Sequence, residues 1–222
     1  MLKLAVLASG RGTNLQAILD HIRAGRIDAE IALVLSNNPA APALRIAEEA
    51  GIPIWAEAHA SYPSRAAFDS AMLAAMREAG IEAVILAGYM RLLSPEFIRA
   101  YPGKILNIHP SLLPAFPGAQ GGADALAYGV KLAGCTVHFV VEAMDAGPIV
   151  IQAALPVLEA DTEQSLMERV HALEHRIYPQ AVAWFAQGRL VPEGRAVRLL
   201  AANRALAPAG PALIHPPLEQ GF

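Results

Sequence analysis

The sequence has no apolar run of the ~20 residues that a membrane-spanning helix needs, and runs such as residues 83–87 are only strand-sized. It also has no cluster of lysine or arginine, and its formal net charge at pH 7 is −3. A nucleic-acid-binding surface requires a basic patch of that kind. We therefore expect neither a membrane span nor a nucleic-acid partner.

Cysteine is almost absent: the single residue, Cys135, lies inside the apolar run 135–141. It cannot form an internal disulfide, so we expect a small buried side chain there. The chain shows no metal-ligand spacing and no internal repeat, and its first residues lead directly into a predicted strand without a secretory signal. We expect a cytoplasmic protein without a bound metal.

With 222 residues, 17% of them charged and 55% hydrophobic, the chain suits one globular domain. Short apolar runs alternate with segments of helical periodicity, a pattern typical of a doubly wound, Rossmann-like α/β domain with a mostly parallel sheet. Residues 135–141 and 149–157 read as an antiparallel pair. The predicted domain covers 1–195, in halves of about 1–100 and 101–195, and 196–222 reads as a tail, draped or partly disordered apart from an edge strand at 195–200.

A glycine loop, residues 9–14, joins the first predicted strand to the first helix. Thr13 and Gln16 fit a capping box, which places the loop amides at a helix N-terminus that attracts phosphate. An ordinary tight turn is the alternative. A dinucleotide fits poorly, because Leu15 replaces the third glycine of the Gly-x-Gly-x-x-Gly pattern and Ser-Asn-Asn at 36–38 replaces the acidic ribose ligand. A single phosphate monoester fits better.

The stretch Leu-Asn-Ile-His-Pro-Ser-Leu-Leu-Pro at 106–114 follows the apolar run 104–106. Strand alternation puts Asn107 and His109 on one face near the carboxyl end of that strand, the edge where open α/β sheets bind ligands. An amide donor beside an imidazole suits a carbonyl oxygen that becomes negative during reaction. Taken singly, these two residues also fit a polar turn after a core strand.

The whole string 106–114 resembles the catalytic signature of the folate-dependent formyltransferases. From about residue 2 to 190 the chain is most similar to those of purine synthesis, the phosphoribosylglycinamide formyltransferases. The resemblance implies an enzyme, monomeric or homodimeric, that transfers the formyl group of its co-substrate 10-formyltetrahydrofolate directly to the amine of glycinamide ribonucleotide.

The resemblance also implies roles for particular residues. The catalytic triad would be Asn107, His109 and Asp145. The ribonucleotide would be bound by Gly12, Thr13, Asn14 and Glu174. The folate would be bound by Arg65, Met90, Arg91, Leu92, Leu93, Asn107, Val141, Glu142, Ala143, Met144 and Asp145.

Several of these residues also have simpler explanations that do not depend on the resemblance. Arg65, in the first turn of a helix capped by Ser64, either faces an anion or is a solvated charge. Residues 90–93 could be a loop with buried anchors, and Glu174 could belong to a solvated helix face. His138, inside an apolar strand, is predicted to be structural, and the stripe of Phe68, Met72 and Met76 is predicted to be core.

The chain departs from the family in the loop 115–124, where prolines and glycines predict a mobile lid. Bacterial relatives usually carry one or two histidines and a larger apolar residue here, whereas this chain has Ala119, Gln120, Gly121 and Gly122. Other enzymes with the same triad are alternatives: a formyltetrahydrofolate hydrolase, which usually has an extra N-terminal domain, an amino-sugar formyltransferase, or a methionyl-tRNA formyltransferase, which needs a basic second domain. A non-catalytic nucleotide-binding module is another.

Overall fold

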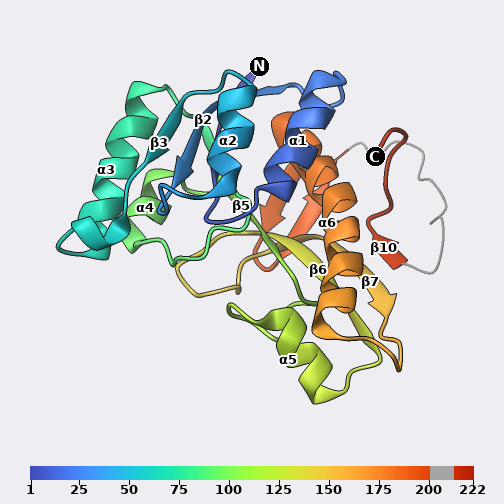
Figure 1. The fold of residues 1–222 in the computed structure, drawn as a ribbon. Helices are drawn as coiled ribbons and strands as arrows, with labels where there is room; N and C mark the ends of the chain where they lie inside the picture. The colour runs from blue at the N-terminus through green and yellow to red at the C-terminus, as the bar shows by residue number, and fades with distance from the viewer. Residues whose placement is uncertain (201–212) are drawn as a thin grey trace. The chain divides into compact units, whose positions relative to one another are not determined.

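The computed structural model describes residues 1–200 and 213–222. The chain divides into two compact units, Met1–Asn107 and Ile108–Phe222, and each is described by itself (Figure 1). The first unit contains the parallel strands and the second contains the antiparallel ones. The predicted α/β class, with a mostly parallel sheet and an antiparallel pair, is confirmed.

The first unit is built on parallel strands whose side chains are mostly buried, because helices cover a parallel sheet on both faces. The strand order is β5-β4-β1-β2-β3, and every neighbouring pair is parallel. The strands are β1 (Leu2–Leu7), β2 (Ala29–Ser36), β3 (Ile54–Ala56), β4 (Ala83–Leu86) and β5 (Ile105–His109).

Three helices of this unit begin where the sequence supplies a capping side chain or a proline. They are α1 (Thr13–Arg23), α2 (Pro42–Glu49), α3 (Arg65–Glu78), α4 (Pro95–Ala100) and the 3₁₀ turn η1 (His59–Ser61). Helices α1 and α2 contact each other and β2, whereas α3 contacts α4 (Figure 1). The predicted cap at Ser64 is confirmed, since its hydroxyl accepts the Ala67 amide at 3.1 Å. Phe68, Met72 and Met76 are fully buried, so the stripe is core as predicted.

The second unit contains a three-stranded antiparallel arrangement in the order β10-β7-β6. The strands are β6 (Leu132–Phe139), β7 (Ile149–Pro156) and β10 (Leu213–His215), and a separate hairpin is formed by β8 (Leu190–Glu193) and β9 (Ala196–Leu199). Gly134 is required in β6, because a Cβ there would lie 1.9 Å from the carbonyl oxygen of Ala153. The β7 backbone therefore lies too close to position 134 of β6 for a residue with a side chain.

Two helices, α5 (Gly121–Tyr128) and α6 (Glu163–Ala186), complete this unit and contact each other. Thr162 caps α6 in a reciprocal capping box with Ser165, an arrangement that depends only on residues three positions apart. One face of α6 is buried, with Leu166, Val170, Leu173 and Ile177 at helical spacing.

The expected strand near 195–200 is present as β9, whereas β10 was not predicted. Arg189 and Glu219 form a bidentate ion pair, with Nη2–Oε1 at 2.7 Å and Nη1–Oε2 at 3.2 Å. The final residues are thus held by β7 pairing and by a largely buried ion pair, whereas residues 201–212 of the predicted tail lie outside the described part of the chain. Within 1–200 and 213–222, no helix has the length and apolarity to span a membrane.

Candidate active site

Strand β5 places Asn107 and His109 two residues apart at its carboxyl end, so both project to one face. His109 is 4% exposed, and Asn107 is half-buried. The strand position predicted for the pair is therefore observed. It fixes an amide and an imidazole on rigid backbone.

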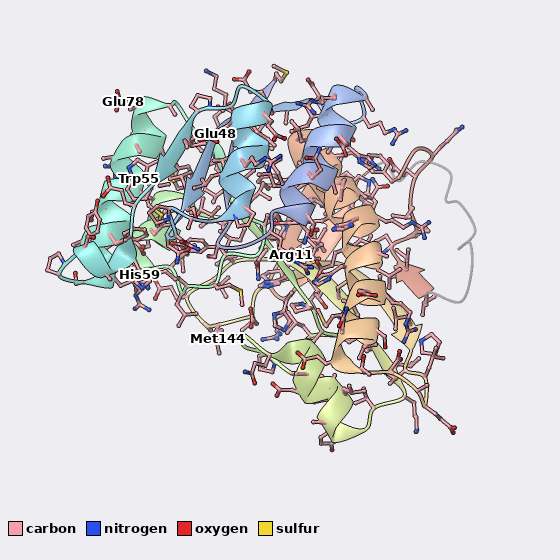
Figure 2. The ribbon with its side chains drawn as sticks, in the orientation of Figure 1. Arg11, Glu48, Trp55, His59, Glu78 and Met144 are labelled. Carbon is pink, nitrogen blue, oxygen red and sulfur yellow. The ribbon has the colours of Figure 1, made fainter. Side chains whose placement is uncertain are left out.

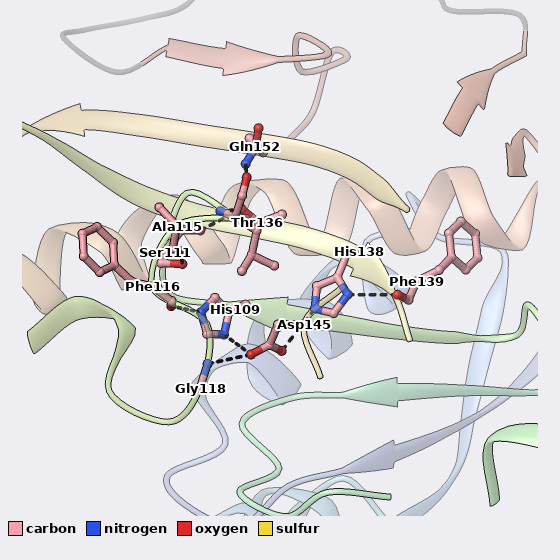
Figure 3. Close-up of polar contacts among 11 residues, drawn as sticks. His109, Ser111, Ala115, Phe116, Gly118, Thr136, His138, Phe139, Asp145 and Gln152 are labelled. Atoms are coloured by element: carbon pink, nitrogen blue, oxygen red, sulfur yellow. Dashed lines mark hydrogen bonds and ion pairs between the residues drawn. The ribbon is translucent and has the colours of Figure 1, made fainter. Parts of the chain in front are cut away.

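The His109 ring lies between two acceptors (Figure 3). Its Nδ1 is 3.6 Å from the Oδ2 atom of Asp145, and its Nε2 is 2.9 Å from the carbonyl oxygen of Phe116. A carbonyl can only accept, so Nε2 donates. Asp145, 36 residues away along the chain, is thus brought to the imidazole as the resemblance implied.

Asp145 lies in the turn between β6 and β7 with a φ of +51°, in the left-handed region that few residues other than glycine adopt. Aspartate and asparagine are among the side chains that tolerate this region. The Gly118 amide donates to its Oδ2 at 2.8 Å. One oxygen of the carboxylate therefore contacts both the His109 imidazole and the backbone of the 115–120 loop.

His138 is a neighbour of Asp145 that we predicted to be only structural. Its Nε2 is 3.7 Å from Asp145 Oδ1, and its Nδ1 donates to the carbonyl of Phe139 at 2.9 Å (Figure 3). Burial lowers the pKa of His138, so burial disfavours a positive charge on this ring. One feature of the sequence could have indicated this contact: His138 is a polar residue inside an apolar strand, and that strand leads into the turn that contains Asp145.

The predicted lid contains more helix than expected, because α5 begins at Gly121 instead of after Asp124. Both opening glycines lie in close contact with neighbouring side chains. A Cβ on Gly121 would lie 3.0 Å from Nε2 of His109, and one on Gly122 would lie 2.1 Å from the sulfur of Met167. These glycines bring the helix against its neighbours, and the expectation that they form loop is wrong.

The capping box predicted at Thr13 is also wrong. The N-cap is Gly12, without a side-chain cap, and Thr13 is the first residue of α1. Gly12 has a φ of +78°, and a Cβ there would lie 2.8 Å from Cα of Ala43. Position 12 requires glycine, because the backbone there is left-handed and packs directly against α2. The backbone amides at the start of α1 still form a helix N-terminus.

The residues assigned to the folate combine two arginines with apolar side chains. Met90 and Leu92 are 64% and 54% exposed, whereas Leu93 is buried. Arg65 is the first residue of α3, and its charge acts on Asp69 together with that of Arg91.

The second group assigned to the folate is the turn 141–145, in which residues 141–144 are all exposed. Met144 projects from this turn and is 52% exposed (Figure 2). Exposed methionine and valine side chains are adaptable apolar contacts for a flat ring.

Glu174 is only 3% exposed, so the alternative of a solvated helix face is wrong for it. Cys135 is fully buried as predicted, and burial raises the pKa of its thiol. Within residues 1–200 and 213–222 no three His, Cys, Asp or Glu side chains cluster so that they could hold a metal ion.

The chain is similar to known formyltransferases over most of its length. Residues 2–182 match the formyl transferase family model. The phosphoribosylglycinamide formyltransferase of Bacillus subtilis is 45% identical, with 82% of this chain and 93% of that protein covered. The solved glycinamide ribonucleotide transformylase 1 of Symbiobacterium toebii has a TM-score of 0.88 and 54% identity, with 90% and 94% covered.

A second group of relatives is much longer. The trifunctional purine biosynthetic protein adenosine-3 of Gallus gallus is 49% identical over 84% of this chain, but the match covers 18% of that protein. The chain therefore spans about a fifth of the length of these relatives.

Proposed function

The chain belongs to the formyl transferase family, and on that premise we propose that it transfers the formyl group of 10-formyltetrahydrofolate to the amine of glycinamide ribonucleotide in purine synthesis. The similarity to proteins named for this activity supports the proposal. The observation that carries it is the environment of His109, which follows Asn107 on β5 and faces the Asp145 carboxylate at 3.6 Å.

In the proposed reaction the ribonucleotide amine attacks the formyl carbon, and charge develops on the formyl oxygen. The Asn107 amide and the protonated His109 ring donate to that oxygen. As the bond between the formyl carbon and the folate nitrogen breaks, His109 gives its proton to that nitrogen, and the proton lost by the attacking amine restores the charged imidazole. The folate supplies an activated formyl group, so the protein needs to orient the reactants and stabilise charge.

Asp145 has two proposed tasks. Its carboxylate faces Nδ1, which orients the ring and favours the positively charged imidazolium. Nε2 is then the nitrogen directed toward substrate. In this structure the Phe116 carbonyl accepts from Nε2 at 2.9 Å, a position that a substrate acceptor would take once the loop shifts.

The substrate contacts are also part of the proposal. The N-terminus of α1 at Gly12, Thr13 and Asn14 suits the phosphate of the ribonucleotide, because backbone amides and the helix dipole both favour an anion there. Glu174 receives another polar part of this substrate. The exposed apolar side chains within 90–93 and 141–144 suit the folate ring, and Arg65 suits an anionic group.

Purified protein would test this function directly. We expect 10-formyltetrahydrofolate to be consumed only when glycinamide ribonucleotide is present, with formylated ribonucleotide detected by mass spectrometry. The His109→Ala variant is the control for the chemistry. Formate release without the ribonucleotide would favour the hydrolase alternative, and no consumption under any condition would favour a binding module.

A further inference from the structure

Asp69 is a buried carboxylate that no step of the proposed reaction uses. It lies on α3 between the core residues Phe68 and Met72 and is 2% exposed. Burying an ionised carboxylate is costly unless it is paired and hydrogen-bonded. Its partners therefore show what the residue holds in place.

The strongest partner is the end of the segment 88–94. The backbone amide of Ser94 donates to Asp69 Oδ2 at 2.6 Å, and the Ser94 hydroxyl caps α4 by accepting the Phe97 amide at 3.2 Å. A short bond to a charged acceptor is among the stronger hydrogen bonds in proteins. Asp69 thus fixes the point where the folate-assigned residues end and α4 begins.

The other end of the segment is held independently by Ser9. The Ser9 amide donates to the Gly88 carbonyl at 3.0 Å, and its hydroxyl accepts the Met90 amide at 2.9 Å and donates to Asn37 at 2.6 Å. The backbone between Met90 and Ser94 is therefore attached at both ends, while Met90 and Leu92 stay exposed in between.

Asp69 also faces the two arginines that the resemblance assigns to the folate. The charges of Arg65 and Arg91 both act on its carboxyl group. The Arg91 guanidinium lies 5.7 Å from the centre of the Phe68 ring, a cation–π distance. Two neighbouring residues of α3 thus interact with the Arg91 guanidinium: Phe68 through its ring and Asp69 through its charge.

The Phe68 ring is itself held by other aromatic side chains. Trp55 and Tyr62 pack on it with centroid distances of 5.4 and 5.2 Å, and His59 approaches at 6.4 Å. Trp55 and His59 lie beside α3 in Figure 2. The Phe68 ring near Arg91 is therefore packed against three other aromatic side chains.

Burial of the Asp69 carboxyl group removes the water that would stabilise its charged form. Burial raises the pKa of Asp69, although the Ser94 hydrogen bonds and the charges of Arg65 and Arg91 lower it in part. A residue that is unfavourable for the fold and has specific polar partners is often kept for function.

We propose that Asp69 is a positioning residue for the folate-binding segment. Its carboxylate sets the course of the backbone at Met90–Leu93 through the Ser94 amide, and its negative charge acts on Arg65 and Arg91. The inference rests on the proposed function, because it assigns the segment to the formyl donor. It predicts that changes at Asp69 alter the binding of the folate and leave the ribonucleotide and the chemical step nearly unchanged.

Steady-state kinetics of Asp69→Ala and Asp69→Asn test the proposal. Asp69→Ala leaves the Ser94 amide and both arginines without the carboxylate, so we expect KM for 10-formyltetrahydrofolate to rise by about tenfold or more. Asp69→Asn keeps an acceptor for Ser94 but loses the charge, so a smaller rise is expected. For both variants kcat and KM for the ribonucleotide should stay within about twofold of the parent. Asp28→Asn, an exposed carboxylate away from these contacts, is the matched control.

Amide hydrogen exchange and direct binding of tetrahydrofolate separate this inference from the proposed function. We expect faster exchange at 90–94 in both variants, and a tetrahydrofolate Kd that rises in step with the folate KM. If the parent transfers formyl groups but the folate KM of the variants is unchanged, or both KM values rise equally, Asp69 is not a positioning residue for the donor. If the parent is inactive, the function fails, and unchanged exchange and Kd would still overturn the role of Asp69. Should Asp69→Ala fail to fold, Asp69→Asn carries the same comparisons.

Discussion

Replacing Asp145 by asparagine removes one negative charge from the candidate active site and changes little else. The position has a φ of +51°, which asparagine tolerates better than most residues. The asparagine carbonyl can still accept the Gly118 amide, which donates to the present carboxylate at 2.8 Å. We therefore expect the turn to keep its structure, so that any change in rate results from the loss of the negative charge at position 145.

The size of the effect follows from the distance. A positive charge on His109 at 3.6 Å from the carboxylate gains about 4–5 kcal/mol at an effective dielectric constant of ~20. The Gly118 amide already shares this oxygen and the side chain is partly open to water, so about 3 kcal/mol is a fair estimate of what is lost. Since 1.36 kcal/mol is a factor of ten in rate, kcat should fall about 100-fold.

Single-turnover formyl transfer, with both substrates saturating, would measure the chemical step. The KM values for both substrates should change little, because the charge is needed mainly as the imidazolium forms. Asp28→Asn again controls for loss of a carboxylate. Because the two residues act as a unit, Asp145→Asn combined with His109→Ala should be little slower than His109→Ala alone.

Two results would refute this reasoning. If the rate losses of the single variants multiply in the double variant, the two side chains act independently. If Asp145→Asn keeps full kcat, the 3.6 Å approach has no catalytic role. His138 provides a check, because His138→Gln leaves the His109–Asp145 pair intact and should cost less than Asp145→Asn.

Four further predictions follow from individual contacts. Gly12→Ala should lower the free energy of unfolding by about 2–4 kcal/mol in denaturant titrations, because the position combines a φ of +78° with a backbone contact at 2.8 Å. Glu174→Gln should raise KM for the ribonucleotide about tenfold or more and spare that for the folate; equal changes in both would remove Glu174 from the substrate site. The pKa of Asp69 is raised in the folded state, so protonation of its carboxyl group favours folding. The free energy of unfolding of the parent, relative to that of Asp69→Asn, should therefore be lowest at neutral pH and should rise as pH falls through the folded-state pKa of Asp69. Arg189→Ala should lower stability by about 2–4 kcal/mol by leaving Glu219 unpaired, with kinetics unchanged; an unchanged melting temperature would show that the ion pair contributes nothing.

The parts of the fold that depend on local sequence could be predicted. Strands β1 and β4 are short apolar runs between turn residues, and such runs form buried strands wherever helices cover both faces. The caps at Ser64 and Thr162 each depend on a side chain and an amide three residues away. Nothing distant in the sequence is needed to decide them.

The features that were missed depend on contacts between distant residues. The N-cap at Gly12 follows from the approach of Ala43, which no pattern within the loop reveals. Strand β10 pairs with β7 across about 60 residues, and a three-residue strand carries no periodicity of its own. Asp69 reads as an ordinary helix-surface acid until the Ser94 amide is placed against it.

The loop between β5 and α5 serves the candidate triad through its backbone. The Phe116 carbonyl accepts from His109, the Gly118 amide donates to Asp145, and both groups are present whatever side chains the loop carries. The loop backbone can therefore contact His109 and Asp145 whatever side chains stand at 119–122. The steric constraint falls instead on residues that allow close approach: a Cβ on Gly121 would lie 3.0 Å from both the His109 ring and the Phe116 carbonyl oxygen. The conformation of the loop, more than its side-chain chemistry, is therefore what holds the imidazole and the carboxylate in register.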